Sequence, residues 1–135
     1  MSEMVDVFRV KPGQELLGEL IRYCSQNHIT SGLILGIIGS VESAKLNFLT
    51  ALPGRYESVE YAGPLEIVCA QGSVALKESD VIVHVHIQLS RQDGSVGGHL
   101  VEARVFSTAE VAIQRLDGQL RRVLDGQTGL NELDA

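Results

Sequence analysis

Apolar side chains recur at alternate positions through most of this chain, and this period of two limits the fold more than any other feature. From Gly32 onward the segments are "GLILGIIGSVE", "AKLNFL", "YESVEYA", "LEIVCAQGSVALKE", "DVIVHVHIQLS", "HLVEARVF" and "AEVAIQRL", separated by Gly, Asp and Ser turns. Alternation of this kind is typical of β-strands, whose side chains point in turn to the two faces of a sheet. The short separations favour a largely antiparallel sheet.

One segment has the helical period instead. In residues 14–29, Leu17, Leu20 and Cys24 fall on one stripe, which predicts an amphipathic helix. A first strand is expected over residues 3–10, ended by a Pro-Gly pair. A helix near the start and a long series of strands predict an α+β fold, with helices flanking a largely antiparallel sheet.

The chain has the size and composition of one folded domain. It has 135 residues, 44% of them hydrophobic and 21% charged, and no linker or internal repeat divides it. We therefore expect a single domain over residues 1–135. The longest apolar run, residues 32–41, is too short to cross a bilayer. The net charge of −6 argues against nucleic acid as the main partner, because phosphate binding needs a basic surface.

The two cysteines indicate a compartment. Cys24 and Cys69 lie in unrelated apolar segments, which favours two free, packed thiols in a reducing environment. The first residues contain neither a basic region nor an apolar core, so we expect no signal peptide. These observations predict a cytoplasmic protein.

Three of the four histidines gather in one stretch. His84 and His86 occupy alternate positions of a strand pattern, so both imidazoles should point to one face. His99 follows after the turn signal Asp93-Gly94. A two-residue turn at Asp93-Gly94 would place His99 opposite Gln88 and diagonal to His86, whereas a looser turn would place it directly opposite His86. Either register puts all three imidazoles on the same face.

Three converging imidazoles suit zinc, which takes nitrogen ligands in a tetrahedral arrangement and leaves a fourth position open. The other interpretation is that these are half-exposed side chains of an ordinary sheet, and spacing alone leaves both open. Gly97 and Gly98 could close a loop or let the backbone approach a bound ligand. His28, at the expected helix end, is left out of the site.

The chain resembles the PPC ("plants and prokaryotes conserved") domain, in the stand-alone prokaryotic form. The resemblance rests on "GLILGIIGSVESAKLNFL", "GPLEIVCAQGSVAL", "HVHIQLSRQDGSVGGHL" and "VFSTAEVAI", in this order. It implies an antiparallel sheet with flanking helices, a homotrimer, and a zinc ion held by His84, His86 and His99. No AT-hook is present, and Pro64 stands where the plant domain has an arginine linked to partner binding.

The expected fold is also similar to that of acetolactate decarboxylase, a zinc enzyme with three histidine ligands. Zinc with an open position can polarise a carbonyl or lower the pKa of bound water to about 7. An enzyme would need a general acid or base, and the candidates are Glu66, Glu102 and Glu110. We favour Glu66 as the catalytic candidate, because by strand parity Glu102 falls on the face opposite His99 and Glu110 has the character of a strand-edge charge.

Three functions remain open from the sequence. The leading hypothesis is a metal-binding module, holding zinc or another divalent transition metal, that responds to a small-molecule ligand or has a regulatory role. The second is a zinc-dependent lyase or hydrolase acting on a small carbonyl compound. The third is DNA binding through a surface formed in the trimer.

Overall fold

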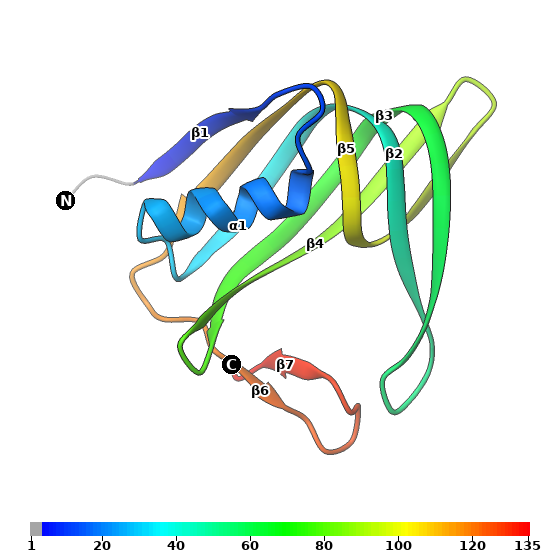
Figure 1. Cartoon of the computed structure of the whole chain (residues 1–135). Helices are drawn as coiled ribbons and strands as arrows, with labels where there is room; N and C mark the ends of the chain where they lie inside the picture. Colours follow the sequence, from blue (N-terminus) through cyan, green and yellow to red (C-terminus); the bar gives the residue numbers. More distant parts are fainter. Residues whose placement is uncertain (1–3) are drawn as a thin grey trace.

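Five antiparallel strands form one strongly curved sheet in this computed structural model, which describes residues 4–135 (Figure 1). The strands are β1 (Val5–Val10), β2 (Gly32–Ala51), β3 (Arg55–Lys77), β4 (Asp80–Arg91) and β5 (Gly94–Arg115). Their order is β1-β5-β2-β3-β4, and the start of β5 also pairs with β4. This second pairing curls the sheet toward a barrel. The expected α+β class with a largely antiparallel sheet is confirmed.

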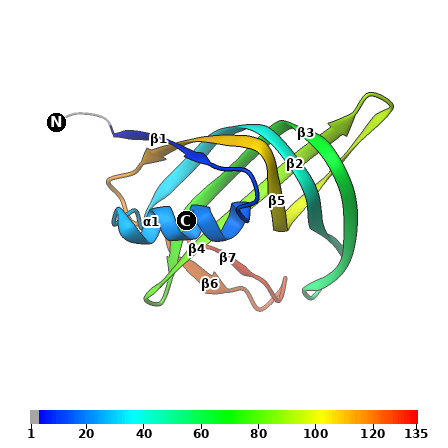
Figure 2. The ribbon, with the colours of Figure 1, turned by 45° about the horizontal axis from the view of Figure 1, so that its top comes forward.

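Helix α1 (Leu16–Gln26) lies across one face of the sheet, which arches over it (Figure 2). The side chain of Glu15 accepts hydrogen bonds from the backbone N–H groups of Leu17 and Gly18, which begins the helix, and from that of Ala103 in β5. Leu16, Leu20 and Cys24 are buried against the sheet. Flanking helices were expected in the plural, but among residues 4–135 α1 is the single α-helix.

The core lies between α1 and the sheet, and its strand residues alternate as expected. In β4 the buried side chains are Val83, Val85, Ile87 and Leu89, and the intervening residues from Ile82 to Gln88 face the other side. This alternation places His84 and His86 on the face of β4 opposite the core. Strand parity was therefore sufficient to predict their orientation.

The strands are longer than the sequence suggested. Pairs of segments that we expected to be separate strands merge into β2, β3 and β5, each with bulges where the register shifts. Gly39 of β2 marks one close approach, because a Cβ there would overlap the backbone of Thr108 in β5. Bulges and glycine contacts let a long strand bend without ending.

The end of the chain forms a small separate hairpin of β6 (Arg122–Leu124) and β7 (Asn131–Leu133), drawn in orange and red in Figure 1. No helix or strand was predicted for this part of the chain. Leu76 of β3 donates its N–H to the carbonyl of Leu120, just before the hairpin, and Gly54, in the turn between β2 and β3, donates to Thr128. The hairpin thus contacts both ends of β3. Within residues 4–135 no helix is long and apolar enough to cross a membrane.

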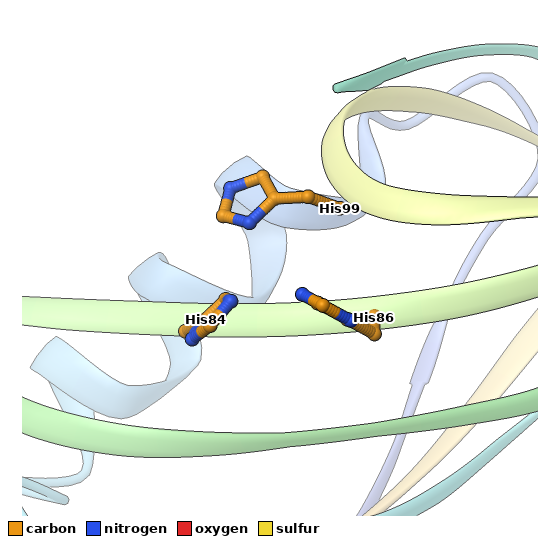
Figure 3. A group of neighbouring side chains, drawn as sticks. All are labelled: His84, His86 and His99. Carbon is orange, nitrogen blue, oxygen red and sulfur yellow. The ribbon is translucent and has the colours of Figure 1, made fainter. Parts of the chain in front are cut away.

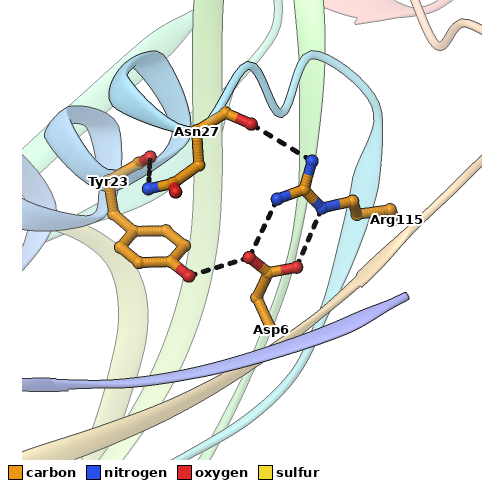
Figure 4. A network of polar contacts seen from close by, with 4 residues as sticks. All are labelled: Asp6, Tyr23, Asn27 and Arg115. Atoms are coloured by element: carbon orange, nitrogen blue, oxygen red, sulfur yellow. Dashed lines mark hydrogen bonds and ion pairs between the residues drawn. The ribbon is translucent and has the colours of Figure 1, made fainter.

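A polar network ties β1, α1 and β5 together (Figure 4). Arg115 donates to both carboxylate oxygens of Asp6, at 2.8 and 2.9 Å, and to the carbonyl oxygen of Asn27. The Tyr23 hydroxyl donates to Asp6 at 2.7 Å. The hydrogen bond from Arg115 lowers the pKa of Asp6, and the bond to Asp6 raises the pKa of Tyr23.

Candidate metal centre

The hairpin of β4 and β5 brings the three histidines together. His86 pairs directly with His99, and the hairpin closes where Arg91 pairs with Gly94. The two residues of the turn are therefore Gln92 and Asp93. The turn expected at Asp93-Gly94 lies one residue earlier in the chain, so the register with His99 opposite Gln88 is wrong. The alternative register, with His99 opposite His86, is the one observed.

The three imidazoles face one another above the sheet (Figure 3). Each offers a nitrogen atom, and these atoms all lie within 4.8 Å of one another. The ring centroids are 5.0 Å apart for His84 and His86, 4.8 Å for His84 and His99, and 5.7 Å for His86 and His99. His86 is exposed, and the other two are partly buried.

Gly97 and Gly98 lie where β5 leaves β4 to join β2. A Cβ on Gly98 would lie 3.1 Å from the carbonyl oxygen of Asn47 and 3.2 Å from the ring of Phe48. A Cβ on Gly97 would lie 3.2 Å from the carbonyl oxygen of Ile87. The close strand contacts explain why small residues stand here. The adjoining His99 is thereby held against both neighbouring strands.

Burial and neighbouring positive charge favour the neutral form of His84 and His99. Desolvation, followed by the proximity of His99, Arg122 and His86, lowers the pKa of His84 to about 4. The pKa of His99 is also lowered, chiefly by burial. A neutral imidazole has the free lone pair that a metal ion requires.

A hollow of about 300 Å³ opens beside His84 and His99. Asn47 and Tyr56 line it from the β2 and β3 side, and Arg122, Asn131 and Glu132 line it from the C-terminal hairpin. Ile82, Val83 and Leu130 complete its lining. Two parts of the chain that are distant in sequence therefore form the walls of one site.

Arg122 is the residue of this site that sequence reasoning missed. Its guanidinium donates to Ser73 Oγ at 3.0 Å and to the Asn131 carbonyl at 3.0 Å, and it lies 3.2 Å from Nδ1 of His84. In the sequence Arg122 belongs to a short basic group that suggested a solvated surface. Only its burial, with 8% of the residue exposed, separates it from neighbouring arginines.

The carboxylate candidates lie elsewhere. Glu66 pairs with Ser90, four residues along β4 from His86, which corresponds to about 13 Å on an extended strand. It is exposed and lines a different hollow with Ser40, Arg91 and Ser107. The structure therefore does not bring Glu66 to the imidazoles. Glu110 is exposed and pairs with Arg9.

The expectation that Glu102 lies on the face opposite His99 is wrong. Lys45 pairs with Glu102 and Leu46 pairs with Leu100, so Val101 is an extra residue in β5. This bulge reverses the parity and puts His99 and Glu102 on the same face. Glu102 lines a further hollow with Lys45 and does not line the one beside the histidines.

The two cysteines are free, but only one is packed as expected. Cys24 is buried in the core, and burial raises the pKa of its thiol to about 11. Cys69 is exposed. It follows a register shift in β3, between Ile67 and Cys69, where a bulge turns the side chain outward.

The donor set fits zinc. Tetrahedral zinc with bonds of about 2.0–2.1 Å to nitrogen needs its ligand atoms roughly 3.4 Å apart. Small rotations of three imidazoles whose nitrogens lie within 4.8 Å can supply that spacing. Three neutral nitrogen ligands leave one position of the ion for water or another ligand.

Comparison with known proteins shows the family of this chain. The model of the Plants and Prokaryotes Conserved (PCC) domain matches residues 2–117. The chain belongs to this family. The three histidines lie within the matched part of the chain, whereas the hairpin that carries Arg122 follows it.

Solved structures share the fold. A metal-containing protein from Archaeoglobus fulgidus is 30% identical, with a TM-score of 0.90, over 96% of this chain and 92% of that one. A plant- and prokaryote-conserved protein from Pyrococcus horikoshii is 27% identical, with a TM-score of 0.89, over 99% of this chain and 94% of that one. Acetolactate decarboxylase from Bacillus subtilis, at 11% identity and a TM-score of 0.61, shares the fold alone over 96% of this chain and 60% of its own. The expected fold similarity to both groups is confirmed.

A curated relative is much longer than this chain. The bifunctional protein GlmU of Synechococcus sp. strain JA-3-3Ab is 31% identical over 128 residues, which is 93% of this chain and 19% of the relative. The chain therefore spans about a fifth of the length of this relative.

Proposed function

We propose that this protein binds a divalent transition metal, zinc, through His84, His86 and His99 and is a ligand-responsive binding module. The observation that supports this is the convergence of three imidazole nitrogens within 4.8 Å. The metal content named for the Archaeoglobus protein is consistent with the same role in this chain. When bound, zinc would supply an open coordination position for a small molecule.

The test is the metal content of protein purified without a histidine tag, beside a His84→Ala/His99→Ala variant. We expect stoichiometric zinc in the wild type and its loss in the double variant, with circular dichroism unchanged. His28→Ala is the matched control, because His28 is exposed and lies outside the site. Wild-type protein that takes up no zinc on addition, or a double variant that keeps it, would contradict the proposal.

An enzyme is the second candidate, and the hollow beside the histidines favours it. Arg122 and Glu132 both line this space, which gives a cation and a titratable carboxylate next to the proposed metal position. We infer that Glu132 is better placed than Glu66 to act as a general acid or base in a lyase or hydrolase. Turnover of a small carbonyl compound by zinc-loaded protein, lost in Glu132→Gln with zinc retained, would support this candidate.

Self-association as a homotrimer is part of the proposal, because apolar side chains are exposed on the face of the sheet away from α1. Val7 is 73% exposed and Ile38 71%, and Val5 and Leu33 lie on the same face by their pairings through β5. An exposed apolar surface of this kind is typical of an interface. Light scattering coupled to gel filtration measures the oligomeric state. We expect a trimer for the wild type and monomers for Ile38→Lys. A wild-type monomer would contradict it.

DNA binding is the third candidate function, and the charge of the chain opposes it. A net charge of −6 gives DNA little attraction, so we expect no binding at physiological salt. Tight, steeply salt-dependent binding in fluorescence anisotropy would reverse this. The free thiols of Cys24 and Cys69 support the proposal of a reducing, cytoplasmic location.

A further inference from the structure

Arg122 is a buried cation without an anionic partner. The residue is 8% exposed, and its partners are a serine hydroxyl, a backbone carbonyl and an imidazole nitrogen. Within residues 4–135 the ion pairs are Arg22 with Glu19 and Arg115 with Asp6, so none involves Arg122. Its Nε is buried with no hydrogen-bond partner in the same part of the chain. Buried charges in proteins are normally paired, so this arginine lacks a counter-ion.

The surroundings of Arg122 define the size and chemistry of the missing partner. The adjoining hollow of about 300 Å³ is at the small end of ligand sites. Its lining includes one cation, two asparagines, one tyrosine and three aliphatic residues. A single cation, with aliphatic residues in the same lining, suits a singly charged organic anion better than phosphate, which usually engages several cations or backbone N–H groups. A guanidinium matches the planar geometry of a carboxylate.

We propose that a small organic carboxylate binds in this hollow, with its carboxylate on the Arg122 guanidinium. The proposal deepens the proposed function, because it rests on the metal site for its role and names the class of ligand. The ligand would lie beside His84 and His99, next to the open position of the ion. The C-terminal hairpin, which carries Arg122 and Asn131, would then be the element that selects the ligand.

The contact between Arg122 and His84 links this ligand to the metal. A guanidinium has donors and no acceptor, so Nδ1 of His84 must accept from it. A metal ion bound at Nδ1 would compete for that lone pair. A metal ion bound at Nε2 would place the ring proton on Nδ1, facing a donor. In both cases Arg122 must release His84, and a carboxylate that takes over its donors favours that release. Carboxylate and metal binding should therefore strengthen each other.

Glu132 is the other charge in the hollow. It lines the space without forming an ion pair with Arg122. Its negative charge opposes an incoming carboxylate, so Glu132→Gln should leave ligand binding unchanged or strengthen it. A weakening in this variant would place the ligand against Glu132 and overturn the proposal.

The experiment is calorimetric titration of metal-free protein with acetate, propanoate and inorganic phosphate. We expect acetate and propanoate to bind to the wild type. Arg122→Gln should lower the affinity for both by roughly tenfold or more, because a hydrogen bond to a charged group contributes about that much. Phosphate should bind more weakly than either. Arg121→Gln is the matched control, because it removes the same charge from the exposed neighbouring residue. Equal weakening in both arginine variants, or none in Arg122→Gln, would overturn the proposal, as would tighter binding of phosphate.

The coupling to the metal is measured separately. We expect propanoate to increase the zinc affinity of the wild type and to have no such effect in Arg122→Gln. Circular dichroism and thermal unfolding check that this variant is folded, and Arg122→Lys, which keeps the charge and loses the planar fork, should retain part of the ligand affinity. Arg122-dependent carboxylate binding in protein that takes up no zinc would refute the proposed metal function and leave the carboxylate site standing. Zinc uptake without Arg122-dependent carboxylate binding would refute the site alone.

Discussion

Arg115 and Arg122 occupy opposite situations in this molecule. The side chain of Arg115 is 29% exposed and forms two hydrogen bonds to Asp6, which also accepts from Tyr23 (Figure 4). Arg122 is more deeply buried, and its hydrogen bonds go to a serine hydroxyl, a backbone carbonyl and an imidazole nitrogen. Arg115 completes a network within the chain. Arg122, next to three histidines, has a guanidinium N–H without a hydrogen-bond acceptor and a charge without a counter-ion among the residues that the structure describes. A buried charge whose partner is missing is a better indicator of a ligand site than one whose partner is present.

The largest effect is expected from removing the carboxylate of the completed network. Asp6→Ala leaves the Arg115 guanidinium and the Tyr23 hydroxyl without their shared partner, so we expect a loss of about 2 kcal/mol in the free energy of unfolding. Urea denaturation followed by circular dichroism measures it. A loss below about 0.5 kcal/mol would show that the network contributes no more than an exposed ion pair.

Arg122→Met should act in the opposite direction. The substitution removes a buried charge that has no counter-ion and replaces it with an apolar side chain of similar length, so we expect a gain of up to about 1 kcal/mol in unfolding free energy. The same urea experiment measures it, with Arg115→Met as the matched control that should destabilise. Destabilisation by both substitutions to the same extent would remove the contrast between the two arginines.

The acid limb of the stability profile should depend on Asp6. Its pKa in the folded protein is lowered below 3.8 by Arg115, so its contribution is fully present above that value and is lost as pH falls through the lowered pKa. We expect Asp6→Asn to flatten the profile between about pH 5 and pH 2. Unfolding midpoints in urea across this range test it. An unchanged acid limb would assign the dependence to other carboxylates.

The smallest effect is expected at an exposed pair. Glu19 and Arg22 of α1 lie 3.5 Å apart, and the side chain of Arg22 is 63% exposed. We expect Arg22→Gln to change the unfolding free energy by less than about 0.5 kcal/mol, because water and salt screen such pairs. This substitution therefore serves as the reference for those at Arg115 and Arg122. A larger loss would indicate that loss of any arginine destabilises this fold.

The histidine cluster could be predicted because its geometry is local. Alternation within one strand sets the face of His84 and His86, and a short hairpin returns His99 to the same face in either of two registers. The parity of Glu102 could not be predicted, since one extra residue at Val101 reverses it. Bulges leave little trace in the sequence. Each residue that follows a bulge in the strand lies on the face opposite to the one that simple alternation predicts.

The sequence by itself determined the alternating sheet, the early helix and the common face of the three imidazoles, because each depends on residues close together in the chain. Only the tertiary structure decided that Glu66 lies away from the histidines and that Arg122 lies beside them. Those positions depend on how β3 pairs with β4 and on where the C-terminal hairpin contacts β3. Burial of a charge depends on segments that meet only in the folded chain, and local sequence patterns do not contain that information.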